Sequence, residues 1–419
     1  MTNIAFKTYG CSNNFHETEV MAGLLEKEGH KLTKEEKADV ILLNICTVKG
    51  DAHAFKEIKN TVENNPNKQI IVGGCVTKEL KQQIKDNFPK IKLLNTHNIQ
   101  KIAQLLKEEV EITGKDSSPK INLPKVRLNK FINIVPINEG CTNHCSYCSV
   151  KLIKGNVKSY PIELIVKEIK ESLKDGVKEI YLTSQDTAAY GVDINLQLPD
   201  LLREVLKIEG EFFIRLGMGN PNHFIKYTDE LIELFKDKKM YKFLHIPVQS
   251  GNNEVLESMK REYTVEEYKT IINKFKKAIP EITIATDVIL GYPEETEEQF
   301  NDTVNLLKQT KPSVLNISRY QLRKNTPAAN MKQIIERDKK TRSRIITKEF
   351  HKFSTENNTK WQGWQGKIII DELGKNNSFV GRNYCYKPVI VKGNYKLGDI
   401  IKVKIKETTI FDLRGEEIE

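Results

Sequence analysis

The sequence predicts an α/β protein built in three parts: a parallel sheet covered by helices, an open partial barrel of six strand–helix units, and a small antiparallel β-barrel. Up to about residue 357, short apolar runs alternate with amphipathic segments, which is typical of parallel strands joined by helices. After Trp361 the composition changes to short β-rich runs separated by Gly and Asn, which suits a small barrel of the OB type. The 419 residues are enough for two or three domains.

Residues 1–113 predict a Rossmann-like unit. The runs expected to form its strands lie at residues 3–11, 39–47, 68–75 and 91–96, and its last helix is expected to end near Glu109. The first three strands end in Cys11, Cys46 and Cys75. Parallel strands with right-handed crossovers all point the same way, so their carboxyl ends share one edge of the sheet. We therefore expect these cysteines, far apart in the sequence, to lie together.

A polar linker at residues 114–130 is expected to lead into the second part, residues 131–357. Its apolar strand-like runs lie at residues 131–137, 178–184, 212–218, 242–248, 283–290 and 314–320. Six units are fewer than the eight of a closed barrel, so we expect an open partial barrel with its site at the carboxyl ends of the strands. A basic helix is expected from Met331 to about Asn357.

The composition argues against a membrane or secreted protein. No apolar run approaches the roughly 18 residues of a membrane span, and the N-terminus lacks the basic-then-apolar layout of a signal peptide. We therefore expect a cytoplasmic protein with no membrane partner. The chain has seven cysteines, and in that compartment thiols stay reduced, which points to metal ligation or catalysis instead of disulfides.

The charge suits a polyanionic partner. The chain has 66 Lys and Arg against 56 Asp and Glu, for a net charge of +10. The segment from Lys311 to Lys360 has 13 basic and 4 acidic residues, which is nearly the whole excess. A solvated helix face is the alternative explanation for this segment.

The cysteines Cys141, Cys145 and Cys148 form a C-x3-C-x2-C run directly after the first strand of the second part. Three thiolates can hold three irons of a cubane cluster and leave the fourth iron open. S-adenosylmethionine (SAM) can chelate that iron, and one electron from the cluster then cleaves its sulfonium to give a 5′-deoxyadenosyl radical. The alternative is a zinc site, which would need a fourth ligand such as His144.

This motif, placed after a strand in a six-unit βα domain, resembles the radical SAM superfamily. Further segments narrow the resemblance to the methylthiotransferases, and to the archaeal and eukaryotic type that modifies threonylcarbamoyladenosine in tRNA. These segments are KTYGCSNN, NICTV, GGC, TSQDTAAYG, HIPVQSG, MKREYT, ATDVILGYPEETEEQF, NTPAA and VGRNYCYKPVIV. The resemblance covers nearly the whole chain. It implies a methylthiotransferase domain at 1–113, a linker at 114–130, a radical SAM domain at 131–357 and a TRAM domain at 358–419.

The resemblance implies two 4Fe-4S clusters. The C-x3-C-x2-C cysteines would hold the one that cleaves SAM, and Cys11, Cys46 and Cys75 would hold a second, also with an open iron, that carries the sulfur to be inserted. One SAM would supply the radical and another would methylate the sulfur. The net reaction would replace hydrogen by a methylthio group at carbon 2 of the adenine at position 37, next to the anticodon. A sulfur donor and a small electron-transfer protein, such as a ferredoxin or flavodoxin, are the implied partners.

The resemblance also implies contacts with SAM. Gln185 ends the second barrel strand, where the family contacts this cofactor, and a capping amide is the alternative role. Gln249 and Ser250 end the fourth strand and are expected to bond the ribose. Arg261 is expected to form a charge-assisted bond to the carboxylate of SAM, with a surface salt bridge as the alternative.

Tyr147 suits stacking against the adenine of SAM, or a buried packing role. Asp287, on the fifth strand, is expected to orient polar groups of cofactor or substrate, or to bond backbone at the sheet edge. Glu294 and Asn325 stand where the family usually has glycine. Asn tolerates the left-handed backbone region, whereas Glu294 adds a bulky carboxylate near the site. Cys385 matches neither triad and is expected to be a small buried residue.

The basic helix and the C-terminal barrel are expected to bind the anticodon stem-loop of tRNA through phosphates. Two alternative substrates keep the same chemistry: isopentenyladenosine in tRNA, and an aspartate of a ribosomal protein. Residues 361–415 have ten Lys and Arg against five Asp and Glu, which favours nucleic acid. A non-catalytic metal-containing RNA-binding protein is the alternative from another class. Two triads of three cysteines argue against it, because structural sites normally have four ligands.

Overall fold

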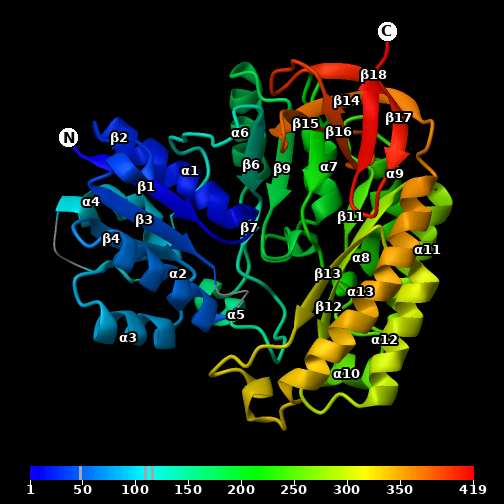
Figure 1. The fold of residues 1–419 in the computed structure, drawn as a ribbon, viewed down its shortest axis with the longest axis horizontal. Helices are drawn as coiled ribbons and strands as arrows, with labels where there is room; N and C mark the ends of the chain where they lie inside the picture. The colour runs from blue at the N-terminus through cyan, green and yellow to red at the C-terminus, as the bar shows by residue number, and fades with distance from the viewer. Residues whose placement is uncertain (47–49, 108–110, 115–117) are drawn as a thin grey trace.

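The computed structural model describes residues 1–46, 50–107, 111–114 and 118–419 of the chain. The chain forms three bodies in sequence order: an N-terminal parallel sheet, a central arc of strands and helices, and a C-terminal barrel (Figure 1). The expected helix end near Glu109 and residues 115–117 of the expected linker lie outside the described residues. Among the described helices, none combines the length and the apolar content that a membrane span needs.

The N-terminal body is a five-stranded parallel sheet in the order β2-β1-β3-β4-β5. Its strands are β1 (Asn3–Thr8), β2 (Lys31–Leu32), β3 (Val40–Ile45), β4 (Gln69–Gly74) and β5 (Lys92–Asn95). Every residue of β3 is buried, as expected for a central strand covered on both faces. The sequence pattern misses β2, because two residues are too few to show a period.

Helices cover both faces of this sheet. They are α1 (Ser12–Lys27), α2 (Asp51–Asn64), α3 (Lys78–Asn87) and α4 (Ile102–Lys107). Ile58 of α2 and Ile41 of β3 share one hydrophobic cluster, while Val20 of α1 and Leu42 of β3 belong to the cluster on the opposite face. Because helices occupy both faces, the carboxyl edge of the strands is where loops and a site can gather.

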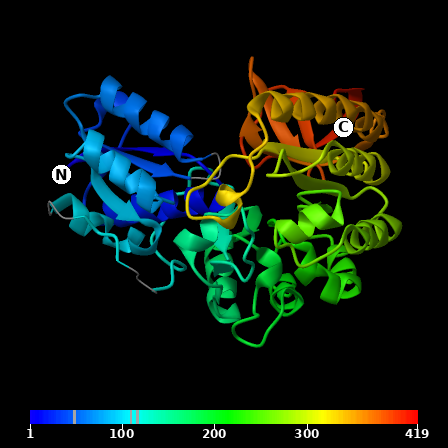
Figure 2. The ribbon, with the colours of Figure 1, turned by 90° about the horizontal axis from the view of Figure 1, so that it is seen from below.

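The central body has the six predicted parallel strands, in two sheets of three ordered β10-β9-β6 and β11-β12-β13. They are β6 (Ile132–Pro136), β9 (Glu179–Thr183), β10 (Phe213–Leu216), β11 (Phe243–His245), β12 (Thr283–Leu290) and β13 (Val314–Arg319). A parallel bridge between Ile214 and Met240 joins the two sheets. The strands therefore follow chain order around a partial barrel, and Figure 2 shows the arc of helices outside it.

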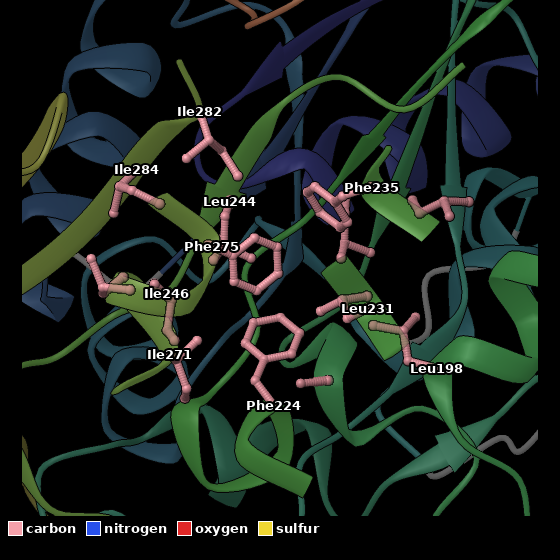
Figure 3. Close-up of a cluster of buried hydrophobic side chains, with 14 of the residues drawn as sticks. Leu198, Phe224, Leu231, Phe235, Leu244, Ile246, Ile271, Phe275, Ile282 and Ile284 are labelled. Carbon is pink, nitrogen blue, oxygen red and sulfur yellow. The ribbon is translucent and has the colours of Figure 1, made fainter. Parts of the chain in front are cut away.

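The outer helices pack apolar side chains on these strands. They are α6 (Ile162–Lys174), α7 (Leu198–Leu206), α9 (Thr228–Phe235), α11 (Val265–Ala278) and α12 (Glu297–Thr310). Phe235 and Phe275 are fully buried and meet edge to face, with ring centroids 5.4 Å apart (Figure 3). Leu244 of β11 lies in this core (Figure 3). Successive strand residues face opposite sides, so the neighbouring His245 faces the inside of the arc. Each such buried side chain contributes about 1.5–3 kcal/mol.

The basic helix α13 (Glu336–Thr359) begins at Glu336, later than the predicted Met331. The chain before it is held by the loop that carries Glu294. The Glu294 N–H donates to the Lys332 carbonyl at 3.1 Å, and the Lys332 N–H donates to Oε1 of Glu294 at 3.3 Å. Tertiary hydrogen bonds therefore replace the first helical turn that the sequence pattern favours.

The C-terminal barrel is closed in the order β14-β15-β16-β18-β17. Its strands are β14 (Gln365–Leu373), β15 (Ser378–Arg382), β16 (Pro388–Lys392), β17 (Ile400–Thr408) and β18 (Leu413–Glu417). Four of these pairings are antiparallel as predicted, and β16 pairs with β18 in parallel. Cys385 is buried in the barrel core, as expected. Tyr386 next to it reaches the central strands, where its hydroxyl lies 2.5 Å from that of Tyr181.

Candidate active site

The C-x3-C-x2-C segment lies in a loop that is closed at its base. Strands β7 (Asn138–Glu139) and β8 (Lys158–Ser159) pair antiparallel, and α5 (Val150–Lys154) lies between the last cysteine and β8. Gly140 has φ +73°, and a Cβ there would come within 2.0 Å of a backbone oxygen across the loop. Its N–H donates to Oε1 of Gln185 at 2.8 Å. The loop therefore requires glycine at this position, and Gln185 holds it from the end of β9.

The thiols of Cys141, Cys145 and Cys148 lie close enough to influence one another. Burial raises the pKa of Cys141 to about 12, and the charges of Asp186, Cys145 and Cys148 add to this shift. In the described part of the chain, no three His, Cys, Asp or Glu side chains converge as they would on a single metal ion. Three cysteines are also one ligand short of the four that a structural zinc ion takes. A four-iron cluster can be held by three thiolates, each on a different iron, with one iron left open. The donor set therefore fits such a cluster better than a zinc ion.

Arg261 lies beside these thiols. Its Nη1 is 3.1 Å from Cys145 Sγ, its Nε donates to the Tyr263 hydroxyl at 3.2 Å, and its guanidinium also bonds the side chain of Asn220. Arg261 is only 9% exposed, so the surface salt bridge considered from the sequence is wrong. A buried cation offsets the negative charge of a neighbouring thiolate ligand. Its bond to the carboxylate of SAM stays a prediction.

Tyr147 and Gln185 already have structural partners. Tyr147 packs against a buried cluster that includes Met259 and Tyr292, and burial raises the pKa of its phenol well above the usual value. The oxygen of Gln185 is engaged by Gly140, which is the capping role considered from the sequence. Stacking of Tyr147 on adenine and a SAM contact by the Gln185 amide group stay predictions.

Gln249 and Ser250 follow β11. Gln249 has φ +68°, an uncommon backbone conformation for a residue other than glycine and one that often marks functional sites. It is fixed to β12, because its N–H donates to the Asp287 carbonyl and its carbonyl accepts from the Ile289 N–H, both at 2.9 Å. Ser250 is fully buried, and its hydroxyl accepts a bond from the Asn252 N–H at 3.3 Å. Contacts of either residue with the ribose stay predictions.

Asp287 belongs to a polar group that spans three neighbouring strands. His245 Nε2 lies 2.9 Å from Asp287 Oδ2, and Asn316 Nδ2 donates to Asp287 Oδ1 at 2.5 Å. Burial alone would raise the pKa of Asp287, but the hydrogen bond and charge of His245 outweigh it and the pKa is lowered. His245 and Asn316 were not predicted as site residues. For His245 the alternation of the strand gave a sign, because its neighbours Leu244 and Ile246 are core residues and His245 must face the other side.

The two departures from the family's glycines both have left-handed backbones. Glu294 has φ +64° and Asn325 has φ +62°, so each occupies a conformation that glycine adopts without strain. The Asn325 side chain donates to Oε1 of Glu79 in α3, which ties this loop to the N-terminal body. Figure 2 shows the loop, in yellow, between the N-terminal body and the central arc.

Cys11, Cys46 and Cys75 come together at the carboxyl edge of the N-terminal sheet. Cys11 is the N-cap residue of α1, and Cys46 and Cys75 directly follow β3 and β4. A hydrogen bond with Cys46 is the largest cause that raises the pKa of Cys75, and burial adds to it. Gly10 has φ +128°, and a Cβ there would lie 2.4 Å from Cys46 Cβ. Only glycine therefore allows the segment before Cys11 to approach Cys46 this closely.

The loop that carries the C-x3-C-x2-C cysteines lies against the N-terminal body. The His97 Nε2 atom bonds the Ile153 carbonyl at 2.8 Å, and Lys154 Nζ donates to Oε1 of Glu17 at 2.6 Å. Ile153 and Lys154 belong to α5, which follows Cys148 closely. The two sets of three cysteines therefore lie on segments that contact each other.

Helix α13 presents basic side chains on one exposed face. We call Arg337, Lys340, Arg344 and Lys348 the basic stripe; all four are exposed, and their spacing of three or four residues places them along one side of the helix. Lys339 and Arg342 are buried instead. Arg342 pairs with Glu295 at 2.6 Å. These two basic residues of the Lys311–Lys360 segment are therefore not available to bind an external anion.

Three family models match the chain. The model of the uncharacterized protein family UPF0004 matches residues 3–113, that of the radical SAM superfamily residues 135–307, and that of the TRAM domain residues 366–418. Among solved structures, the cobalamin-dependent SAM radical enzyme OxsB has a TM-score of 0.54 at 12% identity, over 85% of this chain and 56% of that one. The radical SAM methyltransferase TsrM from Kitasatospora setae has a TM-score of 0.55 at 14% identity, over 78% and 77%. These likenesses concern the fold.

Curated relatives match over the full chain. A protein of Methanothermobacter thermautotrophicus described as a probable threonylcarbamoyladenosine tRNA methylthiotransferase is 38% identical, over 97% of both chains. One of Archaeoglobus fulgidus with the same description is 37% identical, over 99% of this chain and 98% of that protein. The threonylcarbamoyladenosine tRNA methylthiotransferase of Homo sapiens is 37% identical, over 99% of this chain and 74% of the human protein.

Proposed function

This chain belongs to the family of threonylcarbamoyladenosine tRNA methylthiotransferases, and we propose that it replaces hydrogen by a methylthio group at carbon 2 of threonylcarbamoyladenosine at position 37 of tRNA. As a radical SAM enzyme it is a transferase that uses SAM and a 4Fe-4S cluster. The observation that carries the proposal is the contact between the segments that bear two sets of three cysteines, one set on the loop after β6 and one at the edge of the N-terminal sheet.

The cysteines of the loop after β6 would hold the cluster that acts on SAM. When bound, a four-iron cluster with an open iron supplies the electron that cleaves the sulfonium of SAM. The chain's own residues prepare this site. Gln185 holds the loop through Gly140, and Arg261 offsets the thiolate charge next to Cys145. Asp287, oriented by His245, presents a carboxylate to the inside of the arc that would position polar groups of SAM or substrate.

A second 4Fe-4S cluster held by Cys11, Cys46 and Cys75 is the finer part of the proposal. This set also has three cysteines, so an iron would stay open to carry the sulfur that is transferred. A sulfur donor must therefore reload the site, and a small electron-transfer protein such as a ferredoxin or flavodoxin must reduce the clusters. The contact of α5 with the N-terminal body supports a shared reaction space between the two sets.

tRNA is the substrate that the relatives' names and the TRAM domain indicate. We propose that the basic stripe and the C-terminal barrel bind the anticodon stem-loop through phosphates, which gives affinity and register without reading sequence. The modified base would enter the arc at the carboxyl ends of the central strands, near Gln249, and would approach Asp287 inside the arc.

Mass spectrometry of tRNA nucleosides from cells with and without the gene tests the function. Loss of the methylthio form of threonylcarbamoyladenosine, restored by the wild-type gene and not by a Cys145→Ala gene, is the expected result. Loss of the methylthio form of isopentenyladenosine, or of a methylthio aspartate in a ribosomal protein, would instead assign one of the alternative substrates.

A further inference from the structure

Lys154 is a buried lysine that the proposed reaction does not use. It ends α5, and its side chain is 1% exposed. Its ammonium donates to Oε1 of Glu17 at 2.6 Å and to the hydroxyl of Thr96. Removing an ammonium from water costs several kcal/mol unless partners compensate it, so a lysine in this place needs a reason.

Both partners of Lys154 belong to segments that carry the N-terminal cysteines. Glu17 lies in α1, whose N-cap residue is Cys11. Thr96 follows Asn95, which pairs with Gly74 in the parallel sheet, and Cys75 follows Gly74. Because parallel neighbours leave a sheet side by side, the ammonium lies next to the end of β4 where Cys75 begins its loop.

The ammonium of Lys154 lies at the edge of the N-terminal sheet that carries the cysteines. It contacts Thr96, which directly follows β5, and the neighbouring strand β4 leads into Cys75. A positive charge at this edge favours the anionic thiolates that hold a cluster.

A second buried lysine nearby lacks this relation. Lys120 is 2% exposed and donates to Oε2 of Glu139 at 2.7 Å, while its ammonium is 3.7 Å from Oε1 of Glu17. Glu139 also accepts a bond from the Tyr160 hydroxyl at 2.6 Å. The shorter bond of Lys120 goes to Glu139 of β7, in the central body, and not to the sheet edge that carries the cysteines. Lys120 is therefore a matched buried cation of the same interface.

We propose that Lys154 is a positioning residue for the second cluster: it brings a positive charge from the C-x3-C-x2-C loop to the N-terminal cysteines, and with Glu17 it fixes the two cysteine sets relative to each other. This inference rests on the proposed function, because it assigns a partner to its second cluster. A cluster bound by three thiolates carries net negative charge, and reduction adds one more. A cation near such a cluster therefore makes reduction easier and stabilises an anionic sulfur ligand on the cluster.

The test isolates the second cluster. A chain with Cys141, Cys145 and Cys148 changed to Ala is reconstituted with iron and sulfide without oxygen, and we expect about four irons per chain. If this chain binds no iron, the N-terminal cysteines hold no cluster and Lys154 has no cluster to act on. Iron binding therefore tests the second cluster of the proposed function, and the reduction potential then tests Lys154 alone.

In the same background, Lys154→Met and Lys154→Gln are compared by potentiometric titration of the cluster's EPR signal. Gln keeps a hydrogen-bond donor for Glu17 and loses the charge, so it separates electrostatics from folding. We expect both variants to make the reduction equilibrium at least tenfold less favourable, which corresponds to about 59 mV for a one-electron couple. Lys154→Arg keeps the charge and is expected to restore most of the potential.

Lys120→Met is the matched control, since it removes a buried lysine from the same interface. We expect it to lower the melting temperature and to shift the reduction potential clearly less than the Lys154 variants do. An unshifted potential in both Lys154 variants, or an equal shift in Lys120→Met, would overturn the inference and leave Lys154 as a structural ion pair.

Discussion

Replacing Arg342 with Met is expected to destabilise the central body, because it breaks a buried ion pair behind the loop that carries Glu294. Arg342 Nη1 donates to Glu295 Oε2 at 2.6 Å, its Nη2 donates to the Glu295 carbonyl at 3.2 Å, and the two side chains are 8% and 0% exposed. The guanidinium also lies 5.2 Å from the Phe300 ring centroid. Removing one partner of a buried ion pair costs about 3–5 kcal/mol. The melting temperature should therefore fall by about 6–20 °C.

The loss of stability in Arg342→Met should depend on pH. Burial raises the pKa of Glu295 even with Arg342 in place, and removal of the guanidinium raises it further. Such a carboxyl keeps its proton in the folded chain when the unfolded chain has lost it, so its contribution to stability is present below the unfolded pKa and is lost as the pH rises through the folded pKa. Thermal melting should show a larger deficit at pH 8 than at pH 5.

Arg344→Met, on the exposed face of the same helix, is the control, and it should change the free energy of unfolding by no more than about 0.5 kcal/mol. The double variant Glu295→Gln/Arg342→Met should recover part of the loss, since the uncompensated carboxylate is gone. Equal deficits of Arg342→Met at pH 5 and pH 8 would show that Glu295 does not cause the loss of stability, because a buried carboxylate without its partner must respond to pH.

Three further predictions concern the sites. Gly10→Ala would place a methyl group 2.4 Å from Cys46 Cβ, so it should reduce the iron held by the N-terminal cysteines, whereas Gly29→Ala, also at positive φ but in open space, should retain it. Gln185→Ala removes the acceptor for the Gly140 N–H, so it should lower the free energy of unfolding by about 0.5–1.5 kcal/mol and speed the loss of iron to a chelator. Gln185→Glu keeps the acceptor, and an equal rate of iron loss in both variants would argue against the hydrogen bond. Changing the basic stripe to Gln should flatten the plot of log tRNA affinity against log salt by about 0.7–0.9 for each phosphate that the stripe neutralises, and an unchanged slope in filter binding would remove its role.

The order of the elements and the meeting of the N-terminal cysteines could be predicted from the sequence. Six apolar runs separated by amphipathic helices correspond to the six central strands, because alternation of this kind reflects burial between a sheet and its outer helices. Cys11, Cys46 and Cys75 meet because parallel strands share one carboxyl edge, which is a rule of topology and needs no knowledge of side-chain contacts.

The environment of individual polar side chains could not be predicted, because their partners are distant in the chain. Lys154 and Glu17 are 137 positions apart, and Arg261 and Cys145 are 116 apart. The local pattern of apolar and polar residues contains no information about such distant pairs. The start of α13 is displaced for the same reason, since hydrogen bonds between Lys332 and the loop of Glu294 hold the segment that the helical pattern favours.

Iron analysis of the protein reconstituted without oxygen distinguishes two clusters from one or none. We expect about eight irons per wild-type chain and about four when Cys11, Cys46 and Cys75 are changed to Ala. Four irons in both proteins would show that the N-terminal cysteines hold no cluster, and a stoichiometric zinc ion in place of iron would rule out both clusters.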